Sequence, residues 1–211
     1  MAEHNPDGVI ATLHNSAGPR QMNLETSTAS ANGSSRRGKD AKLGLTGVER
    51  HFDEDEIIVS KTDPRGRMTY VNDVFLEVSG YTEDELIGQP HSMIRHPEMP
   101  RCIFKLLWDT IAGGQELFAY VNNRAKNGDN YWVFAHVTPT FDAAGAIVGY
   151  HSSRRCPKRE QIAQIAPLYA ALLAEEQRHD DRKIGMQSAY QRLLDTLAKK
   201  GIGYDEFVFS L

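Results

Sequence analysis

The chain has 211 residues, of which 40% are hydrophobic and 25% charged, with a formal net charge of −4. The length fits one domain with appendages or two small domains. The mild acidity gives no reason to expect a nucleic-acid partner, since such binders usually carry a basic patch or stripe, and no apolar run approaches the roughly 18–20 residues of a membrane span.

The N-terminus and the cysteines indicate the compartment. The first residues lack the charged and apolar regions of a secretory signal. Cys102 and Cys156 lie in different sequence contexts, so a structural disulfide is not expected. We therefore expect a cytoplasmic protein without a membrane span.

Residues 1–46 differ in composition from the rest of the chain. They are rich in Ser, Gly, Asn, Thr and Ala, with a basic cluster at residues 36–39. Apolar residues are too sparse there to offset the entropy cost of ordering, so this segment is predicted to be a disordered N-terminal tail. The basic cluster is read as part of a solvated tail, with contact to an acidic partner as the alternative.

The first half of the following domain reads as two strands and several helices. Residues 57–62 and 68–71 have strand character around a turn that contains Asp63-Pro64-Arg65-Gly66. Asn72 suits the N-cap of a first short helix. Residues 82–85 have capping-box spacing and predict a second. A longer helix is predicted over residues 103–111, ended by two glycines.

The second half reads as a strand meander. Residues 117–124 and 131–141 flank a loop whose Asn127-Gly128 pair is a strong hairpin signal, and residues 147–155 form the last strand. The whole pattern predicts an α+β fold, a five-stranded antiparallel sheet with helices crossing one face. We place this domain at residues 47–156.

Residues 157–211 are predicted to be a C-terminal helical extension. Apolar residues recur there at helical spacing, although Pro167 should end one helix and open the next. Residues 182–185 are expected to separate a further helix, which Gly201 and Gly203 end. Two interpretations stay open: the helices cover a sheet face or edge, or they form a docking or homodimer hairpin.

The stretch from Gly88 to Trp108 contains the densest group of candidate binding residues. Its Pro-rich part, up to Pro100, is called the connector below. The whole stretch holds two histidines, two arginines and a glutamate, together with three prolines. Proline fixes φ and removes a backbone donor, so the connector is stiff. A polar, pre-shaped segment between apolar helices is what the polar edge of a buried cofactor needs.

These residues resemble a known family. Residues 72–75 (Asn-Asp-Val-Phe), 79–82 (Ser-Gly-Tyr-Thr) and 85–91 (Glu-Leu-Ile-Gly-Gln-Pro-His) look like a PAS domain. Residues 93–100 (Met-Ile-Arg-His-Pro-Glu-Met-Pro) and 126–133 (Lys-Asn-Gly-Asp-Asn-Tyr-Trp-Val) are similar to the flavin-binding PAS domain of bacterial aerotaxis receptors. The resemblance covers about half of the chain, from Glu56 to Arg155.

The resemblance implies non-covalently bound FAD and a redox- or oxygen-responsive sensor that is not an enzyme. It also implies a separate signalling partner, such as a chemoreceptor, a kinase or a motility component. One residue departs from the pattern: Leu117 stands where a flavin-contacting tryptophan is expected. The residues that match the family's cofactor site are Asn72, His91, Arg95, His96, Glu98, Trp108, Asn123, Tyr131 and Trp132.

The residue chemistry is consistent with a flavin. Isoalloxazine has an apolar body and amide-like edges, and reduction places negative charge on the ring. Arg95 can stabilise that charge or a phosphate. Asn72 or Asn123 can pair with the ring edge, and aromatic residues can wall it. Each of them also has an ordinary structural interpretation, such as core packing for Trp108 or a helix cap for His96.

Other ligands and functions compete with this reading. A haem could take His91 or His96 as an axial ligand, and a cofactor-free PAS module would serve protein interaction alone. A cysteinyl–flavin adduct of the blue-light type is disfavoured, because Pro90 and His91 stand where the reactive cysteine is expected. A zinc site is disfavoured, because no second ligand pair lies near the two histidines.

Overall fold

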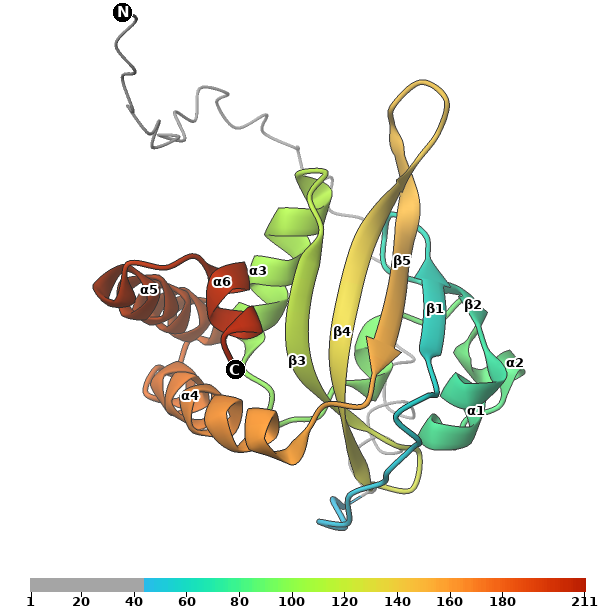
Figure 1. The fold of residues 1–211 in the computed structure, drawn as a ribbon, viewed down its shortest axis with the longest axis horizontal. Helices are drawn as coiled ribbons and strands as arrows, with labels where there is room; N and C mark the ends of the chain where they lie inside the picture. Colours follow the sequence, from blue (N-terminus) through green and yellow to red (C-terminus); the bar gives the residue numbers. More distant parts are fainter. Residues whose placement is uncertain (1–43) are drawn as a thin grey trace, which may run out of the picture. The chain divides into compact units, whose positions relative to one another are not determined.

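The computed structural model describes residues 44–211, so residues 1–43 of the tail predicted at residues 1–46 lie outside the described residues. The sheet has five antiparallel strands in the order β2-β1-β5-β4-β3 (Figure 1). This confirms the predicted α+β fold. The strands are β1 (Ile58–Thr62), β2 (Met68–Val71), β3 (Leu117–Arg124), β4 (Asn130–Phe141) and β5 (Ile147–Arg155).

One face of the sheet, here called the inner face, is covered by short helices and the connector. Asn72 caps the first helix, because its side-chain oxygen accepts a hydrogen bond from the Phe75 backbone N–H. The capping box expected at Thr82 and Glu85 is present. The inner-face elements are α1 (Asp73–Ser79), α2 (Glu83–Leu86), the 3₁₀ turn η2 (His91–Ile94) and α3 (Arg101–Ala112).

The C-terminal helices are α4 (Arg159–Gln177), α5 (Arg182–Lys200) and α6 (Tyr204–Phe209). Helices α4 and α6 pack on the opposite, outer face of β3 and β4, and α5 packs against α4 and α3. The Tyr169 ring of α4 stacks on Trp132 at a centroid distance of 6.3 Å. The Tyr169 hydroxyl donates a hydrogen bond of 2.8 Å to the carbonyl of Tyr120. Covering a sheet face was one of the two interpretations of this extension; docking or dimerisation stays a prediction, as do the domain limits at residues 47 and 156.

The prediction that Pro167 breaks the helix is wrong, because α4 runs through it. Proline leaves the carbonyl four residues earlier, on Ala163, without its helical donor. Both residues are exposed, so the ring points outward and water can satisfy that carbonyl. Ile165 and Leu172 are buried on the other side and hold the helix against the domain.

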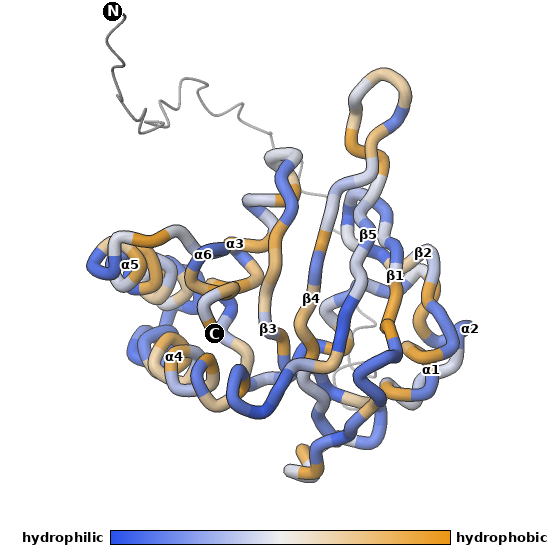
Figure 2. Tube along the Cα trace, in the orientation of Figure 1, coloured by the Kyte–Doolittle hydropathy of each residue, from blue (hydrophilic) through white to orange (hydrophobic). Residues whose placement is uncertain are grey.

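The expected break at residues 182–185 is also wrong, because α5 begins at Arg182. Asp181 sets this start, since its carboxylate accepts hydrogen bonds from the backbone N–H groups of Lys183 and Ile184. A Cβ on Gly185 would lie 2.3 Å from the carbonyl oxygen of Glu176. Glycine there lets α4 and α5 approach closely. The tube of α5 alternates hydrophilic and hydrophobic segments, as a half-buried helix should (Figure 2).

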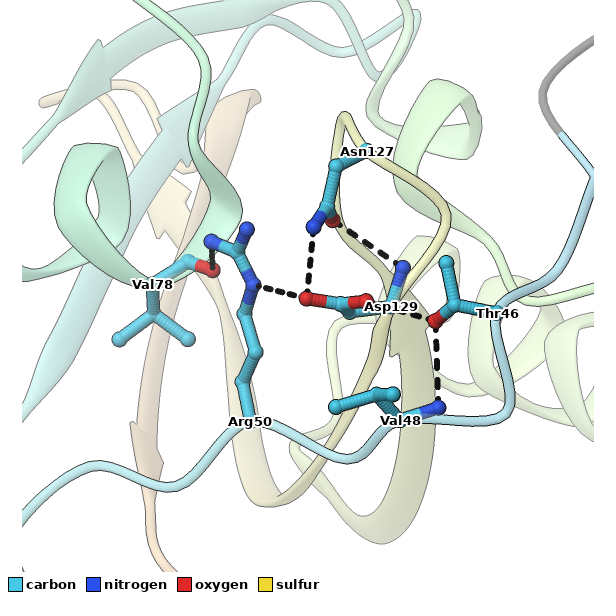
Figure 3. Close-up of polar contacts among 6 residues, drawn as sticks. All are labelled: Thr46, Val48, Arg50, Val78, Asn127 and Asp129. Carbon is cyan, nitrogen blue, oxygen red and sulfur yellow. Dashed lines mark hydrogen bonds and ion pairs between the residues drawn. The ribbon is translucent and has the colours of Figure 1, made fainter.

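The segment before β1 is tied to the β3–β4 hairpin by Asp129, which forms what we call the Asp129 cluster (Figure 3). The Thr46 hydroxyl donates a bond of 2.6 Å and Arg50 Nε one of 2.9 Å to the carboxylate. Asn127 donates a third of 2.7 Å. These bonds lower the pKa of Asp129 to about 2. Ordered contacts thus reach Thr46, at the end of the segment predicted to be a tail.

Within residues 44–211, no helix is both long and apolar enough to cross a membrane.

Candidate functional site

A cleft of about 410 Å³ lies between the inner face, the connector and α3. Its volume falls within the roughly 300–1,000 Å³ of small-molecule sites. Its wall consists of Ser60, Thr62, Arg65, Gly66, Pro90, His91, Ser92, Arg95, Phe104, Leu107, Trp108, Ile111, Val121, Asn123, Ala135, Val137, Tyr150, His151, Ser152 and Arg154.

The strands supply alternate residues to the cleft, because side chains of a strand point to opposite faces in turn. Ser60 of β1 pairs with Ser152 of β5, and Arg154 of β5 pairs with Ala135 of β4. These four therefore share the inner face and line one wall. Arg155, the next residue on β5, is exposed.

The connector and α3 supply the facing wall. The 3₁₀ turn begins after Pro90 and places His91 in the cleft. Arg95 follows the turn, and its guanidinium carbon lies 3.5 Å from the centre of the Phe104 ring on α3. This cation–π contact holds the arginine against the helix.

Trp108 of α3 closes one side of the cleft. Its ring meets Tyr150 edge to face at a centroid distance of 5.4 Å. A Cβ on Gly66 would lie 2.8 Å from the Trp108 ring, and Gly66 has a φ of +77°. Glycine is thus required there both for the backbone turn and for the close approach of the tryptophan.

Arg154, His91 and Ser60 form a hydrogen-bonded cluster in the cleft wall. Arg154 Nη2 lies 2.6 Å from His91 Nε2 and 2.7 Å from Ser60 Oγ. A guanidinium can only donate, so His91 Nε2 is the acceptor and carries no proton. The Arg154 guanidinium also lies 5.4 Å from the centre of the Phe75 ring.

The electrostatics of the cleft are strongly cationic. Burial lowers the pKa of Arg154 to about 10, so the group stays charged at neutral pH. Burial and then the nearby Arg154 lower the pKa of His91 to about 3, which keeps its ring neutral. Burial and then Arg101 lower the pKa of Arg95 to about 10.

Within residues 44–211, the cationic groups of the cleft wall form no ion pair with an acidic side chain. No aspartate or glutamate is among the described residues that line it. Arg154 Nη1 and Arg95 Nε are buried and have no hydrogen-bond partner in residues 44–211. Buried polar groups are normally paired, so these atoms call for a ligand.

Four of the residues implied by the resemblance meet in this cleft: His91, Arg95, Trp108 and Asn123. Asn123 lies on β3, and its backbone bridges to Arg95 of the connector. Together they present a cation, an amide and an aromatic wall to one cavity.

Three other implied residues serve local structure instead of the cleft wall. Asn72 accepts from the backbone N–H of Val59 at 2.9 Å and donates to the carbonyl of Ile57 at 2.7 Å. His96 is buried, and its Nδ1 accepts from the backbone N–H of Glu98 at 3.3 Å. The Glu98 side chain is 72% exposed.

Tyr131 and Trp132 also lie off the cleft wall. Tyr131 is 1% exposed and points to the inner face beyond the cleft, and burial raises its pKa. Trp132 is the next residue on β4, so it points to the outer face and stacks on Tyr169.

The cleft contains residues that the sequence analysis missed, above all Ser60, Phe104, Tyr150 and Arg154. Tyr150, Ser152 and Arg154 share the period of a strand, which is a usable signal for one common face. Arg154 and Arg155 are adjacent, however, and only the pairing with β4 decides which one is buried.

Comparison with known proteins agrees with the fold and with the resemblance. The family model described as PAS fold matches residues 68–154. The chain is 46% identical over 121 residues to the aerotaxis receptor of Escherichia coli (strain K12), a match that covers 57% of this chain and 24% of that protein.

Two further proteins are less similar in sequence. The nitrogen fixation regulatory protein of Klebsiella pneumoniae is 28% identical over 99 residues, covering 47% of this chain and 20% of that protein. The dark structure of the blue-light photoreceptor Aureochrome1 LOV is 26% identical, with a TM-score of 0.45, and the match covers 57% of this chain and 84% of that one. The chain thus spans about a quarter or less of the curated relatives named here.

Proposed function

Because residues 68–154 form a PAS domain similar to part of the aerotaxis receptor, we propose that the chain is a cytoplasmic redox or oxygen sensor that binds FAD non-covalently in the cleft. The observation that carries the proposal is the cleft itself: Arg95 and Arg154 each have a buried nitrogen atom without a partner in residues 44–211, and they face a cavity that aromatic side chains also line. It acts as a sensor and not as an enzyme, and passes its signal to a separate protein.

The chemistry of the residues in the cleft fits a flavin ring. Trp108 and Phe104 offer aromatic faces for a flat ring. Asn123 offers both a donor and an acceptor to a ring edge. Arg95 has a buried Nε without a partner and can donate to an anionic or carbonyl oxygen.

Bound flavin supplies a reversible electron acceptor that gains negative charge when reduced. The protein's part is to orient the ring, exclude water and hold charge. Arg95 responds to a change of ligand charge through its hydrogen bonds. Its backbone link to Asn123 connects the connector to β3, so a shift at Arg95 reaches the sheet.

Glu176 of α4 gives this response a route to the C-terminal helices. Its side-chain oxygen accepts a bond of 2.8 Å from the Cys102 backbone N–H at the start of α3. Glu176 is 8% exposed, and its charge acts on Arg95 by raising that pKa against burial. A movement of Arg95 therefore alters the electric field at Glu176. The partner, a chemoreceptor, kinase or motility component, binds the outer surface of α4 and α5 and responds to the change there.

Haem is a weaker candidate for this cleft. His91 lines the wall, but its Nε2 accepts from Arg154. His96 does not line the cleft, and its Nδ1 is occupied by the Glu98 backbone N–H. A haem iron would have to displace one of these bonds.

The absorption spectrum of the purified chain, before and after incubation with FAD, tests the proposal. We expect two flavin bands that bleach on reduction. A Soret band would convert the assignment to haem, and a protein that stays colourless with added FAD would favour a cofactor-free interaction module. Arg95→Gln is expected to release the flavin while the circular dichroism stays that of the folded domain; full occupancy in this variant would contradict the residue assignment.

A further inference from the structure

Arg154 is the most deeply buried cation of the cleft. It is 4% exposed, and no acidic residue of the described range 44–211 lines the cavity that it faces. Burying a charge without a counter-charge costs several kcal/mol even after relaxation. A guanidinium in this position is therefore costly to the free protein and needs a compensating function.

The neighbours of Arg154 orient it without neutralising it. Ser60 Oγ and His91 Nε2 both accept from Nη2. Both acceptors are uncharged, since burial keeps the pKa of His91 near 3. Nη1 is left buried and without a partner in the described part of the chain. One edge of the guanidinium is fixed, and the other is free to donate to a ligand.

The residues of the cleft wall differ in exposure. Arg65 on the β1–β2 turn and Ser92 of the 3₁₀ turn are exposed. Arg154 is buried, next to Ala135 on the neighbouring strand and 5.4 Å from the centre of the Phe75 ring. A phosphate chain can stay solvated beside the exposed residues, while the buried part of the wall suits a flat ring with a polar edge.

We propose that Arg154, oriented by Ser60 and His91, is a ligand-binding residue that makes the cleft prefer the reduced, anionic form of the flavin over the oxidised, neutral form. The proposal rests on the proposed function, because it names the redox state that the same cleft favours. Two electrons from a reductant in solution and one proton from water give the singly anionic ring, and Arg154 Nη1 donates to the edge that carries the added charge.

The test is the midpoint potential of the full chain reconstituted with FAD, together with the affinity for oxidised FAD. Dithionite serves as the reductant and a dye of known potential as the reference. Arg154→Gln is expected to lower the preference for the reduced form at least about tenfold, which is about 30 mV for a two-electron couple. Arg154→Lys, which keeps the charge, should retain more of the preference for the reduced form than Arg154→Gln.

The matched control is Arg155→Gln, which removes the same charge from the exposed neighbour on β5 and is expected to leave the potential unchanged. Ser60→Ala removes one hydrogen bond that orients Arg154 and should lower the potential in the same direction by a smaller amount. If Arg154→Gln does not fold, the midpoint potential of Ser60→Ala tests the proposal instead.

Other results would overturn the proposal. A folded, flavin-loaded Arg154→Gln protein with the wild-type potential would make Arg154 a structural residue. If Arg154→Gln loses the same affinity for oxidised and for reduced FAD, Arg154 contacts a phosphate of the ligand, and the proposed redox preference is wrong. If the wild-type chain binds no FAD, the proposed function fails and this inference with it; if the wild type binds FAD and only the shift is missing, the inference alone fails.

Discussion

Arg50 and Arg154 place the same chemical group in two different settings. Arg50 Nε meets the Asp129 carboxylate at 2.9 Å, with side chains 28% and 12% exposed (Figure 3). Its Nη1 donates to the carbonyl of Val78 at 3.0 Å. Arg154 is more deeply buried, yet within residues 44–211 its guanidinium forms hydrogen bonds only with the neutral Ser60 and His91.

This difference indicates that Arg50 stabilises the fold, whereas Arg154 has a donor available to bind a ligand. A guanidinium that serves structure is paired with a carboxylate, as in the Asp129 cluster, because pairing offsets desolvation. Sites that bind ligands instead keep unpaired donors at a cost in stability. Substitutions at the two sites should therefore have opposite effects on stability.

The largest effect on the cleft is expected from Gly66→Ala. The new Cβ lies 2.8 Å from the Trp108 ring at a φ of +77°. We expect flavin affinity to fall roughly tenfold or more, since overpacking costs about 1–3 kcal/mol, in addition to a stability loss of about 1–2 kcal/mol for the backbone. Flavin titration and urea unfolding measure the two parts.

Gly145→Ala is the matched control for Gly66→Ala. Gly145 also has a positive φ, of +81°, but a Cβ there meets nothing within 4 Å. This variant should show the backbone cost alone and bind flavin normally. Equal flavin losses in both variants would contradict the role given to Trp108.

The next-largest predicted effect is a change in the free energy of unfolding that has opposite signs at Arg154 and Arg50. Arg154→Met should raise the free energy of unfolding of the flavin-free protein by about 1 kcal/mol or more, because an apolar side chain replaces a buried, unpaired charge. Arg50→Met should lower it, since Asp129 then loses a donor. Urea unfolding of both variants checks the signs. A loss of stability in Arg154→Met as large as in Arg50→Met would remove the distinction between the two sites.

His91 should make the free protein sensitive to moderate acid. Its folded pKa of about 3 lies below the ordinary value of 6.5, so the unfolded chain binds the proton more readily. Stability is therefore full above pH 6.5 and falls as the pH decreases toward 3. The charged groups that act on this ring are Arg154 and Arg95. His91→Gln should flatten the slope in urea titrations across this range, and an unchanged slope would contradict a buried neutral ring.

The smallest effect on the cleft is expected from Asp129→Asn. The folded pKa of about 2 lies below the ordinary 3.8, so the stability that this carboxylate contributes is present above pH 3.8 and lost as the pH falls through 2. The variant should be less stable than wild type at pH 7, with the difference closing in acid, and should bind flavin normally. A change in flavin affinity would show that the Asp129 cluster and the cleft are not independent.

The fold could be predicted from the sequence because its local signals agree with its tertiary structure. The Asn127-Gly128 turn separates β3 from β4, the strand patterns predicted the limits of β3 and β5, and Asn72 marked the start of α1. Pro167 was misread because packing of α4 on the sheet overrides a local helix breaker when the freed carbonyl faces water.

Residues of the site were predictable only where several polar and charged side chains lie close together in the sequence. His91 and Arg95 lie in the Pro-rich connector and reach the cleft. Arg154 comes from a distant strand, and its burial follows from the register of β5 against β4, which local sequence does not contain. The same period-two alternation sends Trp132 to the outer face.

The most direct test of the account is a crystal structure of the chain with FAD. We predict a flavin in the cleft beside Trp108, with Arg95 donating to the ligand and Arg154 Nη1 within hydrogen-bond distance of a ligand oxygen or nitrogen. A flavin bound elsewhere, or one that leaves Arg154 Nη1 without a partner, would contradict the claim that the unpaired cations of this cleft exist to hold the cofactor.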